Sequence, residues 1–192
     1  MKFTGLFLQI LLKKMVSVGQ INCRQEEIDQ VAEAYGFNSL HRLDYPSTKL
    51  DSLPISALVG SISDVVKKIE PNTIYVNNHR DIHTDHQIAF SAVMSSVKSF
   101  NQPYIKRVLM YETISETEFA APQESSAFYP NVFVDISDYF KIKSRIFQVY
   151  KSEVMNAPFP RSLEVIEALA KYRGSRIGVK YAEAFSLLYE KA

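Results

Sequence analysis

Three of the four histidines in this chain, His79, His83 and His86, fall within eight residues, and Asp81 and Asp85 lie among them. A neutral imidazole is a common zinc ligand, and a nearby carboxylate typically orients it or a neighbouring general acid or base. His83 and His86 are three residues apart, so one helical turn would let both rings face the same point. A single loop histidine is usually only solvated, and Asp85 alone could be a helix N-cap. Five such residues at one junction predict a functional site that can bind a metal.

The elements that must position this cluster alternate between helical and strand-like patterns. Helical spacing of apolar residues marks 24–35, 55–70, 85–99, 138–154 and 161–173, and strand-like runs mark 39–45, 73–77, 105–111, 131–136 and 182–189. This alternation predicts an α/β fold with a mostly parallel sheet and helices on both faces. Ligands of such sheets bind outside the carboxyl ends of the strands. The loop 78–85, directly after the run 73–77, is therefore the expected place for chemistry, and the long loop 113–130 is a second functional candidate.

Composition restricts the class of protein. Of the 192 residues, 46% are apolar, which is enough for one domain with its own core. The net charge is +1, which argues against a nucleic-acid footprint and against a polybasic membrane surface. Cys23 is the only cysteine, so the sequence excludes an internal disulfide and a Cys-based zinc site and favours a reducing cytoplasm. The apolar run 3–12 is too short to span a bilayer, and no small-residue cleavage site follows it.

The segment Asp81-Ile82-His83-Thr84-Asp85-His86 resembles the second signature of the PIG-L/LmbE-like zinc-dependent N-deacetylases. Further matches to that family follow in order over about residues 21–190. They are Arg24-x-x-Glu27, Lys49-Leu50-Asp51, Tyr111-Glu112-Thr113, Pro130-Asn131 with Val134-Asp135-Ile136-Ser137, and Arg173-Gly174 with Tyr181-Ala182-Glu183-Ala184-Phe185. Each motif alone is weak, but their order and spacing together are specific.

The resemblance implies a Rossmann-like three-layer fold and a hydrolase that removes an N-acetyl group from a sugar-containing substrate, such as one with N-acetylglucosamine. Zn²⁺ is the cofactor it implies, held in the family by two histidines and an aspartate. By the same resemblance, His86 is the metal ligand, His83 stabilises the oxyanion and donates a proton, and Asp85 is the carboxylate partner of His83. Arg24 resembles an arginine that contacts the polar substrate.

The first signature of the family, a His-Pro-Asp-Asp-Glu-like motif, has no match here. In the family it supplies a zinc histidine, a zinc aspartate and the aspartate base, whereas residues 1–20 contain no histidine, aspartate or glutamate. We therefore expect 1–20 to be an atypical segment, from a frameshift, a late start codon or a truncated gene. Residues 21–192 are expected to form a single deacetylase domain whose first strand-helix unit is missing or replaced.

Three functions remain open on this basis. The first is a deacetylase family member that is impaired or inactive in this form and binds zinc weakly. The second is an active enzyme with a rearranged site built from His79, His83, His86 and Asp81. The third is a non-catalytic sugar-binding or assembly module that keeps a groove lined by Arg24 and the loop 113–130. The expected partner is an N-acetylated sugar-containing small molecule, with a homo-oligomer as a further option.

Overall fold

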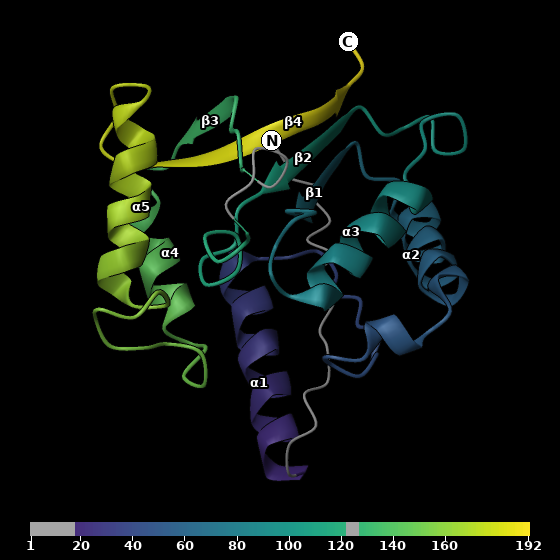
Figure 1. Ribbon diagram of the computed structural model, residues 1–192, viewed down its shortest axis with the longest axis horizontal. Helices are drawn as coiled ribbons and strands as arrows, with labels where there is room; N and C mark the ends of the chain where they lie inside the picture. Colours follow the sequence, from purple (N-terminus) through teal and green to yellow (C-terminus); the bar gives the residue numbers. More distant parts are fainter. Residues whose placement is uncertain (1–17, 122–126) are drawn as a thin grey trace. The chain divides into compact units, whose positions relative to one another are not determined.

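The computed structural model describes residues 18–121 and 127–192, and side chains from residue 23 onward. The expected atypical segment therefore lies, up to residue 17, outside the described residues. The described chain divides into two compact units, which are treated separately below (Figure 1). The first unit comprises His41–Asn131 and Phe185–Ala192, and the second comprises residues 18–40 and Val132–Ala184.

The first unit contains the predicted cluster and the elements on both sides of it. Its elements are the short 3-10 helix η1 (Leu50–Ser52), α2 (Ile55–Ile69), β1 (Thr73–Asn77), α3 (Thr84–Ser96), β2 (Arg107–Tyr111) and the C-terminal part of β4 (Ala182–Glu190). β1 and β2 are parallel, with Asn77 opposite Tyr111 at their carboxyl ends. The predictions for 55–70, 73–77, 85–99 and 105–111 are confirmed to within a few residues.

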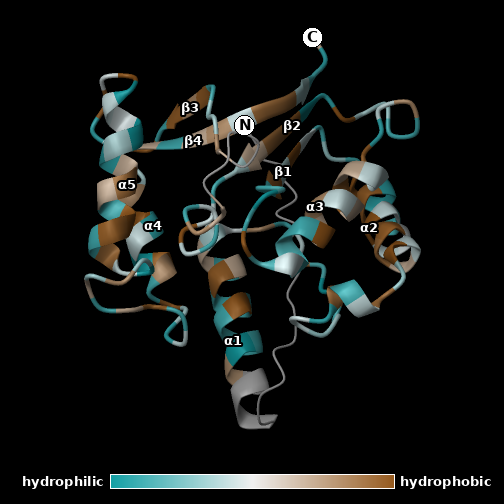
Figure 2. Cartoon of the chain, viewed as in Figure 1, coloured by the Kyte–Doolittle hydropathy of each residue, from teal (hydrophilic) through white to brown (hydrophobic). Residues whose placement is uncertain are grey.

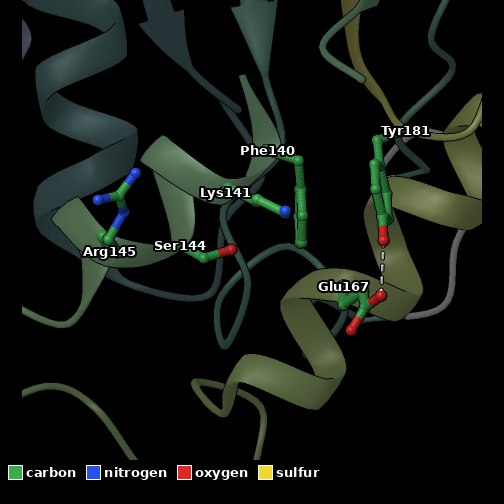
Figure 3. Close-up of a pocket in the computed structure, with 6 residues that line it drawn as sticks. All are labelled: Phe140, Lys141, Ser144, Arg145, Glu167 and Tyr181. Carbon is green, nitrogen blue, oxygen red and sulfur yellow. Dashed lines mark hydrogen bonds between the residues drawn. The ribbon is translucent and has the colours of Figure 1, made fainter. Parts of the chain in front are cut away.

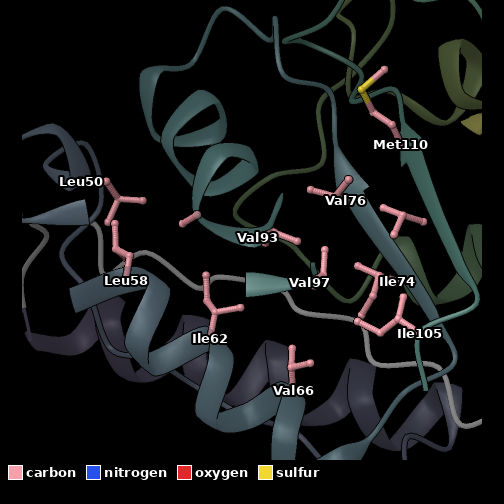
Figure 4. Close-up of a cluster of buried hydrophobic side chains, with 12 residues drawn as sticks. Leu50, Leu58, Ile62, Val66, Ile74, Val76, Val93, Val97, Ile105 and Met110 are labelled. Carbon is pink, nitrogen blue, oxygen red and sulfur yellow. The ribbon is translucent and has the colours of Figure 1, made fainter. Parts of the chain in front are cut away.

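The core of this unit lies between α2, α3 and the two parallel strands. Leu58, Ile62 and Val66 are spaced four apart on α2 and are at most 1% exposed. Burying side chains of this size stabilises the fold by roughly 1.5–3 kcal/mol each. The cluster consists of Leu50, Leu58, Ile62, Val66, Ile74, Val76, Ala92, Val93, Val97, Ile105, Val108 and Met110 (Figure 4). In Figure 2, the strands β1 and β2 are coloured as hydrophobic, whereas the loop that leads into α3 is coloured as hydrophilic.

The second unit contains α1 (Val18–Tyr35), β3 (Val132–Asp135), α4 (Phe140–Phe147), α5 (Leu163–Ser175) and the N-terminal part of β4. Gly36 ends α1 with a φ of 67°, and its backbone N–H donates to the carbonyl of Glu33. Gly174 allows a close approach, because a Cβ there would lie 2.6 Å from the carbonyl oxygen of Val179. α4 is shorter than the predicted 138–154, since turns follow it at 148–149 and 151–153.

The four-stranded sheet has the order β1-β2-β4-β3 and is mixed. The prediction of a mostly parallel sheet is wrong in this respect, because β4 pairs antiparallel with β2. From Leu187 to Glu190, β4 alternates between partly buried and exposed residues, a pattern typical of antiparallel strands. The pattern of strands and helices alone does not determine the direction of a last strand.

The prediction of a strand at 39–45 is also wrong. This segment forms no strand, and a single bridge residue, Pro46, follows it. Asp44 has a φ of 51° and Thr48 a φ of 60°, both in the left-handed region. Extended strand geometry needs negative φ values, so these two positions turn the backbone out of a ladder.

Candidate active site

The loop from β1 into α3 is held together by its own polar side chains. Asn77, the last residue of β1, donates from Nδ2 to the carbonyl of His86 at 2.8 Å. His83 is the N-cap of α3, and its Nδ1 accepts a hydrogen bond from the backbone N–H of Asp85 at 3.2 Å. The N-cap is therefore His83 and not Asp85. These bonds fix the first turn of α3 against the carboxyl end of β1.

Asp81 and His86 form the shortest contact between a histidine and a carboxylate in the described site. The Oδ2 of Asp81 lies 2.7 Å from the Nδ1 of His86, and Asp81 is fully buried. A carboxylate only accepts hydrogen bonds, so Nδ1 carries the proton and Nε2 is left with its lone pair. Metal-ligating histidines typically have this arrangement, in which a carboxylate holds the other ring nitrogen.

His83 has the opposite arrangement. Its Nδ1 accepts from the N–H of Asp85, so in the neutral ring the proton is on Nε2. The His83 and His86 rings stack with centroids 5.3 Å apart and an interplanar angle of 26°. Their side chains are 29% and 28% exposed. The pair thus combines one nitrogen that can accept a proton or bind a cation with one N–H that can donate.

Asp85 is fully buried and mainly anchors a neighbouring loop. Its carboxylate accepts from the backbone N–H of Thr48 at 2.5 Å and from that of Leu50 at 3.0 Å. The distance from its Oδ2 to the Nδ1 of His83 is 4.0 Å. Its predicted role as the carboxylate partner of His83 stays a prediction. What the geometry adds is that Asp85 positions the segment that leads into η1.

The loop after β2 reaches the same cluster through Thr117, which no sequence pattern singled out. The hydroxyl of Thr117 donates to the Oδ1 of Asp81 at 2.5 Å and accepts from the backbone N–H of Thr113 at 2.8 Å. The backbone N–H of Ile82 donates to the carbonyl of Glu116 at 3.2 Å. The only sequence signal was that this threonine lies in the long loop that was already a functional candidate.

Two further titratable groups surround the cluster. Burial, reinforced by the charge of Asp81, raises the pKa of Tyr111 to about 12, so this phenol at the end of β2 stays neutral. Burial and the nearby charge of Arg80 lower the pKa of His79, against an opposing effect of Asp81. The His79 ring contacts that of Phe90, with centroids 5.3 Å apart. His79 is therefore a neutral ring packed on an aromatic side chain.

The described residues do not form a complete zinc site. Within 18–121 and 127–192, no group of three or more histidine, cysteine, aspartate or glutamate side chains converges to hold a metal. Zinc sites in proteins use three or four such ligands in tetrahedral geometry. Within these residues, His86 therefore offers one nitrogen, Nε2, whose lone pair is available to a metal ion.

Arg24 belongs to the second unit, where its guanidinium is shared among several partners. It lies 3.4 Å from Glu27 and 3.0 Å from Glu153, and its Cζ is 4.8 Å from the centre of the Tyr150 ring. Glu27 is 5% exposed and also accepts from the backbone N–H and the hydroxyl of Ser152. These contacts make Arg24 part of a structural network, and its substrate role stays a prediction.

A hollow of about 430 Å³ lies in the second unit, between α4, α5 and the start of β4 (Figure 3). The rings of Phe140 and Tyr181 stack there with centroids 4.1 Å apart. The hydroxyl of Tyr181 donates to Glu167 at 2.8 Å, and the ammonium group of Lys171 lies 2.9 Å from the same carboxylate. None of the predicted site residues lines this hollow.

Comparison with known proteins finds similarity to one family of deacetylases. The PIG-L family, described as GlcNAc-PI de-N-acetylase, matches residues 10–97. Diacetylchitobiose deacetylase of Thermococcus kodakarensis is 26% identical over 164 residues, which cover 83% of this chain and 60% of that relative. The chain is thus similar in sequence to the PIG-L/LmbE-like deacetylase family. The family is zinc-dependent, and the chain spans about 60% of the length of this curated relative.

Solved structures of similar proteins have the same fold. A conserved protein of Thermus thermophilus superposes with a TM-score of 0.75 at 20% identity, over 98% of this chain and 82% of that one. N,N'-diacetylchitobiose deacetylase from Pyrococcus horikoshii superposes with a TM-score of 0.66 at 21% identity, over 88% of this chain and 64% of that one. Among the described helices, none is both long and apolar enough to cross a membrane.

Proposed function

We propose that this chain binds an N-acetylated sugar-containing molecule and carries the histidine half of an N-deacetylase site, with hydrolysis impaired in this form. The observation that carries the proposal is the opposite arrangement of the two stacked rings. His86 has a bare Nε2 with Asp81 behind it, and His83 has an N–H at Nε2. Amide hydrolysis needs both a group that activates water and a donor to the developing oxyanion.

The roles of the chain's own residues follow from this arrangement. His83 donates a hydrogen bond from its Nε2–H to the acetamide oxygen as negative charge develops there, and it keeps this proton. His86 accepts a proton at Nε2 from the water that attacks the acetamide carbon, and this proton passes to the departing amine as the C–N bond breaks; the same nitrogen is the one that would bind a cation. Asp81 and Asp85 keep the two rings and the adjoining loops in place through buried hydrogen bonds.

The names of the relatives support the substrate class. GlcNAc-PI de-N-acetylase and diacetylchitobiose deacetylase both describe the removal of an acetyl group from an acetylated sugar. Arg24 belongs to this proposal as a residue that contacts polar groups of the sugar, because its side chain remains 32% exposed beside its ion pairs. Among the described residues, the single available nitrogen of His86 supports impaired turnover.

Purified chain tests the proposal directly. After dialysis we expect zinc well below one equivalent, slow acetate release from diacetylchitobiose, and measurable binding of that sugar by calorimetry. H86A should remove the residual zinc, and H83A should lower acetate release without changing the zinc content. Stoichiometric zinc with rapid turnover would refute the impairment. A chain that neither binds nor hydrolyses acetylated sugars would refute the function.

Two alternatives predict different results in the same experiments. A rearranged site that uses His79 requires H79A to abolish metal binding, whereas the contact of this ring with Phe90 predicts unchanged metal content. A non-catalytic sugar-binding module is the second candidate, favoured by the lack of a three-ligand cluster among the described residues. Sugar binding that a chelator does not weaken, with no acetate released, would identify it.

A further inference from the structure

We propose that Asp81 is a positioning residue with two functions: it fixes the tautomer of His86, and through Thr117 it ties the loop after β2 to the same imidazole. Both oxygens of this fully buried carboxylate are engaged. Oδ2 lies 2.7 Å from the Nδ1 of His86, and Oδ1 accepts from the Thr117 hydroxyl at 2.5 Å. A single side chain thereby connects the first turn of α3 to the segment 113–117.

Electrostatics explains why the tautomer follows from this contact. A buried carboxylate is costly unless donors surround it, and Asp81 has two side-chain donors among the described residues. The other neutral tautomer of His86 would place a nitrogen lone pair against a carboxylate oxygen, at a distance where only a donor is tolerated. The proton is therefore held on Nδ1, and Nε2 keeps its lone pair.

The loop depends on the same carboxylate through a short chain of hydrogen bonds. The backbone N–H of Thr113 donates to the Thr117 hydroxyl, which in turn donates to Asp81. The Ile82 N–H then joins the loop to the segment before α3 through the carbonyl of Glu116. Thr113 is a natural comparison, because its own hydroxyl is buried with no partner among the described residues.

This inference concerns the same site as the proposed function, but its test does not depend on activity. Nitrogen-detected NMR of the His86 imidazole, at a pH where the ring is neutral, reads the tautomer directly. In the unmodified chain we expect the Nδ1–H form to predominate. D81A should give a mixture of tautomers, and D81N, which retains one acceptor oxygen, should give an intermediate result.

D85N is the matched control for a merely structural effect. It alters an equally buried carboxylate that binds the backbone of Thr48 and Leu50, so it should loosen that loop and leave the His86 tautomer unchanged. An Nδ1–H tautomer that persists in D81A would overturn the first half of the proposal. A chain that fails to hydrolyse any sugar would still give either result.

The loop function has its own pair of variants, which do not alter a charged group. T117V removes the bridging hydroxyl and should speed hydrogen exchange at the Thr113 amide about tenfold, the order expected for one lost hydrogen-bond link to a charged acceptor. T113V removes a hydroxyl that has no partner among the described residues and should leave exchange at Ile82 and Thr117 unchanged. If the backbone amide of residue 113 exchanges at the same rate in T117V as in T113V, the second half of the proposal is overturned. This result does not depend on whether D81A folds.

Discussion

Two regions of the molecule contain buried carboxylates. One is the junction between β1 and α3, and the other is the segment around Glu27. The cationic or basic partners of these carboxylates differ between the two regions. Around Glu27, the carboxylate accepts from Ser152 and the neighbouring guanidinium of Arg24 is divided between Glu27 and Glu153. At the junction, Asp81 and Asp85 are each satisfied by hydrogen bonds, yet within the described residues neither His83 nor His86 has a partner at Nε2.

This difference separates a structural network from a candidate site. In both regions burial requires that the carboxylates be hydrogen-bonded, so burial alone does not indicate function. The histidines are informative because each uses one nitrogen for positioning and keeps the other for a ligand. Arg24 has the residue type expected of a substrate contact, but most of its donors are already used for holding residues 150–153 on α1.

The largest expected effect comes from removing Asp85. D85A leaves the backbone N–H groups of Thr48 and of the buried Leu50 without their carboxylate acceptor. Hydrogen bonds to a charged group contribute about 1.5–3 kcal/mol each, so we expect the free energy of unfolding to fall by at least about 3 kcal/mol in urea titrations. D51A, at an exposed aspartate of the adjoining η1, should change it by less than about 0.5 kcal/mol. A loss under about 1 kcal/mol for D85A would show that the loop does not depend on this anchor.

A somewhat smaller effect is expected at Glu27. E27A removes the acceptor of the Ser152 N–H and hydroxyl and one partner of Arg24, which should lower the free energy of unfolding by about 2 kcal/mol. The neighbouring Glu26 is exposed, so E26A should be nearly neutral. Chemical denaturation of both variants makes the measurement. If E26A cost as much as E27A, the contacts of Glu27 with Ser152 and Arg24 would not explain the loss.

Arg24 itself should contribute less to stability. Its side chain is 32% exposed, and solvent screens such ion pairs, so R24A should lower the free energy of unfolding by at most about 1 kcal/mol. R24K keeps the charge but loses the planar guanidinium that contacts Tyr150. Calorimetric titration with diacetylchitobiose on both variants would sharpen the comparison. Weaker sugar binding at nearly unchanged stability would make Arg24 functional, and unchanged sugar binding would make it structural.

The smallest effect at neutral pH, and a distinct one at high pH, is expected for Tyr111. Its pKa in the folded chain is about 12, above the ordinary value of 10.0. The stability that the neutral phenol provides is therefore complete below about pH 10 and is lost as the pH rises from there through about 12. Y111F should remove part of this alkaline loss, measured as the change in unfolding free energy with pH.

The corresponding tyrosine of the second unit provides the control. Burial, with smaller contributions from Glu183 and Tyr150, raises the pKa of Tyr35 to about 12. Tyr35 is nevertheless 49% exposed, so solvent screens its phenolate and Y35F should change the alkaline loss less than Y111F does. A larger change for Y35F would show that solvent screens the phenolate of Tyr35 less than it screens the phenolate of Tyr111.

Local sequence patterns were enough to define the helices, most of the strands and the location of the cluster. Apolar residues four apart define α2, the apolar run of residues 73–77 defines β1, and Gly36 ends α1. Each of these signals is local, because helical periodicity, strand propensity and positive φ depend on neighbouring residues. The clustering of His83, Asp85 and His86 directly after β1 was visible for the same reason.

The pairing of side chains within the cluster, by contrast, depends on the folded chain. Thr117 meets Asp81 across 36 positions of sequence, and Leu50 meets Asp85 across 35. No spacing rule predicts such contacts, since they depend on how α3 and the loops pack against the ends of β1 and β2.

The antiparallel direction of β4 also depends on the folded chain, because strand pairing is set by hydrogen bonds between residues far apart in the sequence. Burial then requires a partner for each carboxylate of the cluster. That requirement makes His86 the ring held by Asp81 and leaves His83 as the cap of α3.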